Sequence, residues 1–494
     1  MFEVAELGQK LSKKAYDAQA PILRERLLEV QARLRTADFP VIVLFAGVDG
    51  AGKGETANLL NAWMDPRGIV THAYGRPSEE EIEQPRYWRF WRHLPPCGRI
   101  GIFLSAWYSR PLLRRVYEET TDDQYERELN EILSFEQMLA ADGALILKFW
   151  MHLSRKAQHK RLKSLEQDPL SSWRVTKTDW KHWKKYDAFV MSAKKAISRT
   201  STALAPWRII EGADPRFRSI QLGTILLTGV ERQLEARSRG VELRKADDGA
   251  EQPPRIRSGS VLAGLDLTHK LDKSDYKVKL RKFQGRLNRF QRKARARKLS
   301  TVVVFEGWDA AGKGGAIRRI TSALDARDFE IITTGAPTDE ERTHHYLWRF
   351  WRQLGRAGRF TIFDRSWYGR VLVERIEGFA ADEEWRRAYA EINDFERQLV
   401  EHGIVLIKFW LHITPEEQER RFEERRQVPH KSWKLTEEDW RNREKWDSYQ
   451  TAVNQMVGQT STALAPWILV EAEDKRFARI KVLRAVCDAL DRAF

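Results

Sequence analysis

The chain has 494 residues, and its 42% hydrophobic content is enough for packed cores and too high for a disordered chain. Its 86 Lys and Arg against 70 Asp and Glu give a net charge of +16, which favours a polyanionic partner or substrate, although a solvated basic surface has the same signature. The two cysteines, Cys97 and Cys487, exclude a disulfide framework and a cysteine metal cluster. With no apolar leader and no long apolar run, the sequence predicts a cytoplasmic protein without a membrane span.

The two halves of the chain repeat each other at a constant distance of 260 residues, as Lys53 and Lys313 illustrate. Both lysines close the string G-x-x-x-x-G-K, and the stretch TSTALAPW occurs unchanged in both halves. A repeat this long and free of insertions indicates a duplicated domain. We expect a first domain at residues 1–245, a polar linker at 246–262 and a second domain at 263–494.

Taken in chain order, each half begins with a helical arm that leads into a short apolar strand. In the second half the arm ends within 282–298, and later strands are expected at 330–334, 359–363, 404–410 and 467–470. Strands that alternate with helices predict an α/β fold, a mainly parallel sheet covered on both faces in three layers. Ligands then bind beyond the carboxyl ends of the strands.

A phosphate-binding loop, or P-loop, follows the first strand of the second half, at 302–305. Apolar residues at Ile317, Ile320 and Leu324 predict the helix after it. Backbone N–H groups of such a loop wrap a phosphate, and its lysine, here Lys313, neutralises the charge. The predicted phosphate contacts in the loop are Gly307, Gly312, Gly314 and Gly315.

The loop departs from its usual pattern at Gly314, where a Ser or Thr hydroxyl normally holds Mg²⁺. A carboxylate, Asp309, lies inside the loop instead. An acidic side chain beside phosphates is repelled unless a cation stands between them. We therefore interpret Asp309 as a metal contact; the alternative is that it caps the following helix.

A second acidic motif lies at the end of the strand 359–363, where Asp364 takes the position that holds Mg²⁺ in P-loop enzymes. Arg365 and Arg370 follow and are suited to bidentate phosphate contacts. The alternative is a structural Asp-Arg ion pair at the end of a strand.

The first half lacks this pair, because Leu104 and Ser105 stand at the equivalent positions. A leucine cannot hold a metal ion, and a serine cannot neutralise phosphate charge. We expect the second half to be catalytic and the first to have kept the shape without the reaction.

The segment between the last two strands of each half is charged and predicts a lid over the phosphates. Residues 151–200 carry 13 Lys and Arg against 4 Asp and Glu, whereas residues 411–460 carry 9 against 10. Arg421 and Arg425 are the predicted phosphate contacts, with Arg420 and Arg426 as further candidates, and a salt-bridged helix face is the alternative. The basic first-half segment and the basic arm 273–298 suggest that a long polyanion is held, a hypothesis from charge.

Two other residue types are assigned to ordinary packing. Trp88, Trp91, Trp348 and Trp351 favour core positions over base stacking. His344, His345 and His412 have no metal-ligand spacing with cysteine or carboxylate partners.

Five strings of the second half, GWDAAGKGG, APTDEE, YLWRFW, FDRSWYGR and KFWLHI, together resemble the polyphosphate kinase 2 family over nearly the whole chain. The duplication, with YGRVLVER, is similar to the two-domain subgroup that phosphorylates AMP from inorganic polyphosphate. The resemblance implies tandem P-loop kinase-like domains and a Mg²⁺ requirement, with Mn²⁺ as the substitute. It places catalysis on Asp309, Lys313, Asp364 and Arg365, with the metal at Asp309 and Asp364.

Several alternatives stay open at this point. The acceptor could be ADP or GDP in place of AMP, and an ATP-dependent nucleotide or polynucleotide kinase would share the P-loop. A nucleic-acid-binding protein would use the basic arm and the tryptophans, but two P-loops and a strand-end Asp-Arg are unneeded for binding alone. We therefore expect polyphosphate and AMP as partners, no nucleic acid and no membrane, with a homo-oligomer left open.

Overall fold

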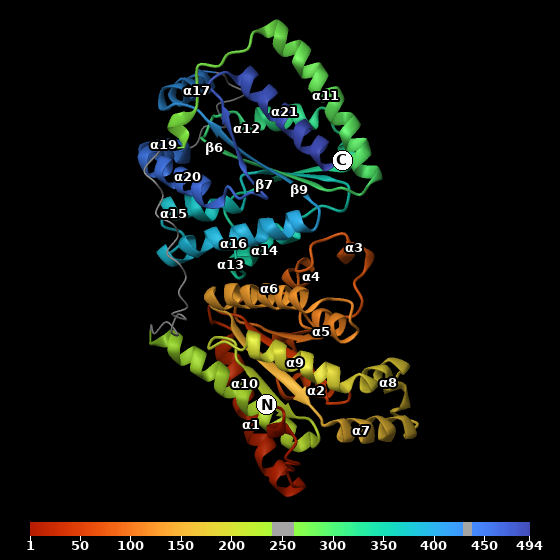
Figure 1. The fold of residues 1–494 in the computed structure, drawn as a ribbon. Coiled ribbons are helices and arrows are strands. Elements are labelled where there is room, and N and C mark those ends of the chain that lie inside the picture. Colours follow the sequence, from red (N-terminus) through yellow and green to blue (C-terminus); the bar gives the residue numbers. More distant parts are fainter. Residues whose placement is uncertain (240–260, 428–436) are drawn as a thin grey trace. The chain divides into compact units, whose positions relative to one another are not determined.

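Residues 1–239, 261–427 and 437–494 are described by the computed structural model. Of the predicted linker 246–262, residues 246–260 lie outside these ranges, so the predicted boundaries stay a prediction. The chain divides into two units, each built around one five-stranded sheet (Figure 1). Unit 1 comprises Met1–Pro77, Phe90–Gly249 and Asp339–His345, and unit 2 comprises Ser78–Arg89, Ala250–Thr338 and Tyr346–Phe494.

The two sheets have the same strand order, β2-β3-β1-β4-β5 in unit 1 and β7-β8-β6-β9-β10 in unit 2, and every neighbouring pair is parallel. The strands of unit 1 are β1 (Val41–Gly47), β2 (Ile69–Ala73), β3 (Ile100–Leu104), β4 (Leu145–His152) and β5 (Trp207–Glu211). Those of unit 2 are β6 (Thr301–Gly307), β7 (Phe329–Thr333), β8 (Phe360–Asp364), β9 (Val405–His412) and β10 (Trp467–Glu471). The predicted parallel sheets are confirmed, each strand within two residues of its expected bounds.

Helices fill the segments between the strands. In the first half they are α1 (Lys13–Leu34), α2 (Lys53–Trp63), α3 (Glu79–Ile82), α4 (Trp88–Trp91), α5 (Ser109–Val116), α6 (Asp122–Ala141), α7 (Arg155–Gln167), α8 (Lys177–Lys184), α9 (Tyr186–Thr200) and α10 (Pro215–Ser238). In the second half they are α11 (Lys273–Ala296), α12 (Lys313–Thr321), α13 (Asp339–Arg342), α14 (Trp348–Arg352), α15 (Val373–Ile376), α16 (Asp382–Glu401), α17 (Pro415–Gln427), α19 (Glu437–Glu444), α20 (Trp446–Thr460) and α21 (Lys475–Ala493). Within unit 2, α11, α12 and α21 cover one face of the sheet, and α16 and α20 cover the other (Figure 1).

The strand before each P-loop lies at the centre of its sheet and is mostly apolar. Six of the seven residues of β6 are buried, which is typical of a parallel strand covered on both faces. The register pairs Phe305 of β6 with Asp364 of β8, so that Asp364 ends its strand beside the strand that enters the P-loop. Ile317 and Ile320 are buried as predicted, but α12 ends at Thr321, so Leu324 reaches the core from the following turn.

A buried ion pair joins the fourth strand to the helices beneath it in both units. Lys408 Nζ lies 2.7 Å from Glu396 Oε2 and donates to the carbonyl of Thr460 at 2.8 Å. Lys148 and Glu136 repeat the pair at 2.6 Å in unit 1. All four side chains are at most 2% exposed, so each charge depends on its partner.

Two further expectations concern packing and membranes. Trp88, Trp91, Trp348 and Trp351 are all buried, which confirms them as core residues. Across the three described ranges we find no helix with the length and apolar character needed to span a bilayer.

Candidate active site

The P-loop of unit 2 is built on two glycines with left-handed backbone. Gly307 has φ 147° and a Cβ there would lie 2.5 Å from the carbonyl oxygen of Leu411, so that only glycine fits. Gly312, with φ 108°, is the N-terminal cap of α12. Lys313 begins that helix, and its Nζ donates to the carbonyls of Gly307 at 2.6 Å and Trp308 at 3.3 Å. These bonds keep the ammonium group inside the loop.

Asp309 contacts the second acidic motif and the lid at the same time. Its Oδ1 accepts from Arg365 Nη2 at 2.9 Å, and its Oδ2 accepts from Asn442 Nδ2 of α19 at 3.0 Å. Burial by itself would raise the pKa of Asp309, but the charges of Lys313 and Arg365 and the Asn442 hydrogen bond outweigh it and hold the pKa below its usual range. Asp309 is therefore a carboxylate, and α12 has no side-chain cap, so the capping alternative is wrong.

The strand-end pair takes a strained backbone turn. Arg365 has φ 64°, and its N–H donates to the carbonyl of Phe305 at 3.0 Å. A left-handed arginine is costly and typical of functional sites, where the surrounding structure imposes the strain. Asp364 is half-buried and its carboxylate forms no hydrogen bond with any residue of the described ranges, so its oxygens are available for a ligand.

Glu306, which the sequence analysis missed, lies under this turn. It is buried, and its Oε1 accepts from Ser366 Oγ at 2.8 Å. Burial raises its pKa, while the charges of Lys313 and Arg365 act in the opposite direction. We infer that Glu306 positions the Arg365 turn through Ser366. A carboxylate in an apolar strand, directly before a P-loop, is the signal that could have revealed it.

The lid divides into residues that hold the loop and residues that could reach a ligand. Arg421 is 2% exposed on its side chain, and its guanidinium donates to the carbonyls of Ala310, Ala311 and Ala472 at 2.6 to 3.1 Å. Arg421 Nη2 also donates to the carbonyl of Glu473 at 2.8 Å. This geometry gives Arg421 a role in holding the P-loop, in place of the predicted phosphate contact.

The other two predicted arginines differ in their partners. Arg425 is half-buried and pairs with no carboxylate of the described ranges, so it stays a predicted phosphate contact. Arg370 lies 3.2 Å from Glu374 and 3.7 Å from Glu384, so a phosphate would compete with two carboxylates there. The part of the lid at 428–436 lies outside the described residues.

The lid also reaches the P-loop through residues that sequence reasoning did not select. Besides Asn442, the ring of Trp446 at the start of α20 stacks on Trp308 of the loop, with centroids 3.7 Å apart. Trp308 Nε1 donates to Nδ1 of the buried His412 at 3.0 Å. Burial lowers the pKa of His412 to about 4, so this histidine is a neutral acceptor near pH 7.

Unit 1 keeps the loop geometry but differs from unit 2 at the end of the neighbouring strand. Lys53 donates to the carbonyls of Gly47 at 2.6 Å and Val48 at 3.0 Å, as its counterpart does in unit 2. Ser105 keeps the left-handed turn, with φ 53°, but Leu104 ends the strand in place of a carboxylate. The loop and its lysine are retained, whereas the strand-end carboxylate and arginine are replaced by Leu104 and Ser105.

A glutamate lies in the first turn of the helix that follows the unit 1 loop. Glu55 takes the position of Gly315, and its carboxylate lies 2.8 Å from Arg161, 3.1 Å from Arg174 and 2.9 Å from Arg218. Arg161 is the counterpart of Arg421. In unit 1, Arg218 of α10 donates to the equivalent loop carbonyls, those of Ala51 and Gly212, at 3.3 and 3.1 Å. Arg161 is thereby released to bind Glu55.

The donor set of unit 2 fits a hard divalent cation. Mg²⁺ prefers one or two carboxylates together with substrate phosphates, and Asp364 and Asp309 offer carboxylate oxygens at the P-loop. Within the ranges that the structure describes, no three His, Cys, Asp or Glu side chains gather to hold a metal by themselves. The substrate would therefore complete the coordination.

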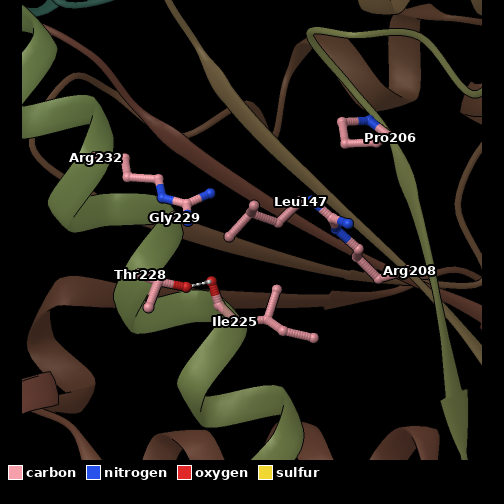
Figure 2. Close-up of a pocket in the computed structure, with 7 residues that line it drawn as sticks. All are labelled: Leu147, Pro206, Arg208, Ile225, Thr228, Gly229 and Arg232. Atoms are coloured by element: carbon pink, nitrogen blue, oxygen red, sulfur yellow. Dashed lines mark hydrogen bonds between the residues drawn. The ribbon is translucent and has the colours of Figure 1, made fainter.

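A hollow in unit 1 lies apart from these motifs. Figure 2 shows it between α10 and the strands β4 and β5, with Leu147, Ile225 and Gly229 beside Arg208 and Arg232. None of its lining residues belongs to the P-loop, the end of β3 or the lid.

Comparison with known proteins agrees with this geometry. The profile described as "Polyphosphate kinase 2 (PPK2)" matches residues 10–238 and 270–493. The chain belongs to the polyphosphate kinase 2 family. Relatives of this family include a protein of Pseudomonas aeruginosa (strain PAO1) named "Polyphosphate:AMP phosphotransferase", which is 52% identical over 495 residues covering 100% of this chain and 99% of the relative.

Two further members show how far the likeness extends. A crystal structure of a polyphosphate kinase 2 from Pseudomonas aeruginosa PA01 matches with a TM-score of 0.89 and 50% identity, covering 100% of this chain and 99% of that one. A Rhizobium meliloti protein named "ADP-polyphosphate phosphotransferase 2" is 41% identical over 213 residues, covering 43% of this chain and 70% of the relative. The family thus contains members that match the whole chain and members that match less than half of it.

Proposed function

We propose that this chain transfers a terminal phosphoryl group from inorganic polyphosphate to AMP, which yields ADP, and that unit 2 carries the reaction. The observation behind this proposal is that the chain matches relatives named for the AMP reaction along its whole length. The asymmetry of the two P-loops supports unit 2, because Asp364 and Arg365 are replaced by Leu104 and Ser105 in unit 1.

Phosphoryl transfer depends mostly on positioning the phosphates and neutralising their charge. Different residues of unit 2 can bind different phosphates of the substrates. Lys313 and the loop N–H groups hold the phosphate that is transferred. The Arg365 guanidinium is 41% exposed on its side chain, so it can contact phosphate oxygens while Asp309 keeps it in place. Arg370 and Arg425 are the outer phosphate contacts in this assignment.

Asp309 and Asp364 would hold Mg²⁺, or Mn²⁺ in its place, and the bound cation would neutralise phosphate charge. No strong general base is needed, because a phosphate monoester has a second pKa near 6 and the attacking oxygen of AMP is already largely deprotonated at neutral pH. The donor set of the chain agrees, since Asp309 is held as a carboxylate acceptor and not as an acid.

The test is turnover in a mixture of protein, AMP, long-chain polyphosphate and Mg²⁺ without ATP. We expect ADP to form, and chelation of the metal to stop the reaction. Formation of ADP only when ATP is supplied would replace the proposal with an ATP-dependent kinase.

A polyphosphate-dependent ADP or GDP kinase is the second candidate, since relatives with such names match part of the chain. These relatives cover 43% of it, whereas the relatives named for AMP span both units. We therefore place AMP first, and turnover with ADP or GDP as the sole acceptor tests the second candidate. We also propose a cytoplasmic location, on the basis of the two unpaired cysteines.

A further inference from the structure

Two arginines flank the start of the P-loop helix in unit 2, and neither pairs with a carboxylate of the residues that the structure describes. A Cβ on Gly315 would lie 3.1 Å from Arg479 Nη2 of α21, and Arg319 Nη1 donates to the carbonyl of Gly315 at 3.3 Å. Within the described ranges neither arginine forms an ion pair, although Arg319 Nε donates to Tyr276 Oη at 3.3 Å. Burial and the neighbouring charge of Arg319 both lower the pKa of Arg479. Adjacent cations of this kind favour an anion between them.

The basic helix α11 contacts Arg319, one of these two arginines. Tyr276 and Gln284 attach it to α12, since Gln284 Nε2 donates to the carbonyl of Arg319 at 3.0 Å. Lys277, Arg281 and Arg292 recur at spacings that place them on one side of the helix. All three are exposed, and none pairs with a carboxylate of the residues that the structure describes.

The opposite side of α11 packs against α21. Arg286 pairs with Asp488 at 3.0 Å and with Asp491 at 2.9 Å, and the two helices lie beside each other (Figure 1). The exposed cations are therefore not needed to attach the helix. From Lys277 to Arg292 they extend along roughly 20 Å of helix, at about 1.5 Å per residue.

Unit 1 provides an internal comparison, because it has the same helices without these charges. Its residues at the positions of Lys277, Arg281 and Arg292 are Asp17, Pro21 and Ala32. Those at the positions of Arg319 and Arg479 are Leu59 and Ser219. Glu55 stands where Gly315 is and is bound by three arginines. The cations and the glycine at position 315 occur together in unit 2 and are missing together in unit 1.

We propose that unit 2 carries an extended polyanion track, along which a long polyphosphate donor runs from the P-loop over Gly315, between Arg319 and Arg479, and onto the Lys277, Arg281 and Arg292 side of α11. This inference rests on the proposed function for the identity of the polyanion. The track binds the part of the chain that does not react, so it sets the affinity for long donors and leaves short donors nearly unaffected.

The test uses the full chain and fluorescently end-labelled long-chain polyphosphate, without nucleotide. Two variants address the track: Lys277→Glu with Arg281→Glu on α11, and Arg319→Leu with Arg479→Ser, which introduces the unit 1 residues. A matched control, Lys13→Glu with Lys14→Glu, makes the same change of charge on exposed residues at the start of α1.

We expect each track variant to weaken binding of the long chain by about tenfold or more at low salt, and the control to change it by less than about twofold. The slope of log Kd against log salt should fall by roughly two in the α11 variant, because two cations that displace counterions are gone. In turnover with AMP, the α11 variant should raise the KM for long polyphosphate and leave the KM for tripolyphosphate and the kcat unchanged.

Equal binding of the long chain by the wild type, the control and both track variants would overturn the track. So would a loss of tripolyphosphate turnover equal to that of the long chain in the α11 variant, because the effect would then lie in the active site. Failure to make ADP with any donor would refute the proposed function, and the binding measurement would still decide on the track.

Discussion

The two P-loops of this chain share a backbone and differ in what occupies the space beside it. In unit 2 the loop lies beside Gly315 and near Arg319 and Arg479, neither of which forms an ion pair within the described ranges, and Asp364 ends the neighbouring strand. In unit 1, Glu55 stands at the position of Gly315 and pairs with three arginines, and a leucine ends the strand. The two loops therefore have the same backbone geometry, and the charged side chains around them differ.

The arginine that supports the back of the P-loop comes from a different helix in each unit. The carbonyls behind the loop are held by Arg421 from the lid helix in unit 2 and by Arg218 from α10 in unit 1. Both are buried guanidinium groups that satisfy backbone oxygens. The same backbone carbonyl is therefore satisfied from a different helix in each unit.

The largest effect should come from the carboxylate that only unit 2 possesses. Asp364→Asn removes a charge from the phosphate site without changing the shape of the side chain, and we expect kcat to fall by about a thousandfold. The matched change Leu104→Asn in unit 1 should leave kcat within about twofold. Steady-state turnover of AMP with polyphosphate measures both, and an active Asp364→Asn protein would contradict the assignment of catalysis to unit 2.

The buried ion pair should behave alike in both units, because it belongs to the shared scaffold. Lys408→Met leaves Glu396 buried without its cation, and we expect a loss of about 3 kcal/mol in the free energy of unfolding of unit 2. Lys148→Met should cost unit 1 a similar amount. Urea unfolding followed by tryptophan fluorescence measures both losses, and a clear difference between them would show that the two scaffolds are no longer equivalent.

Introducing the unit 1 glutamate into unit 2 should impair donor binding. Gly315→Glu puts a carboxylate beside Arg479, where it would repel polyphosphate and compete for the guanidinium, and we expect kcat/KM for polyphosphate to fall by about a hundredfold. Gly315→Ala is the control, since its Cβ meets only the flexible end of Arg479 and should change kcat/KM by less than about threefold. Equal losses in the two variants would mean that space, not charge, matters at this position.

The smallest effect concerns the buried histidines at the ends of the fourth strands. The pKa of His412 is about 4, whereas an unfolded chain holds histidine near its ordinary value of about 6.5. Between these pH values the unfolded state binds a proton that the folded state does not, so the free energy of unfolding falls as pH falls from 6.5 to 4.

His412→Gln keeps an acceptor for Trp308 and removes this titration, so it should reduce the loss of unfolding free energy between pH 7 and pH 5 by about 2 kcal/mol. Its counterpart His152 also has a lowered pKa because of burial, but Glu6, 2.8 Å away, favours the charged form. His152→Gln should therefore reduce the loss of unfolding free energy between pH 7 and pH 5 by a smaller amount. Urea unfolding at the two pH values compares the variants, and an equal or larger effect of His152→Gln would contradict this reasoning.

The sequence by itself determined the elements that depend on local pattern. The apolar strands, the glycine loop with Lys313 and the strand-end Asp364 follow from neighbouring residues, and the constant spacing of the repeat revealed which half had lost its charged pair. These features are confirmed because strand burial, glycine geometry and parallel pairing are set within short stretches of chain.

Only the tertiary structure decided which side chains face the loop. The sequence predicted Arg421 as a phosphate contact, whereas in the structure its buried guanidinium supports the P-loop backbone. Its partners Ala310 and Ala311 lie about 110 residues away along the chain, so local pattern could not reveal this role. Glu306 and Asn442 gained their importance from contacts with Ser366 and Asp309 that no spacing rule predicts. A local pattern fixes the backbone of a phosphate loop, whereas the charges around it come from distant elements that meet only when the sheet and its helices have packed.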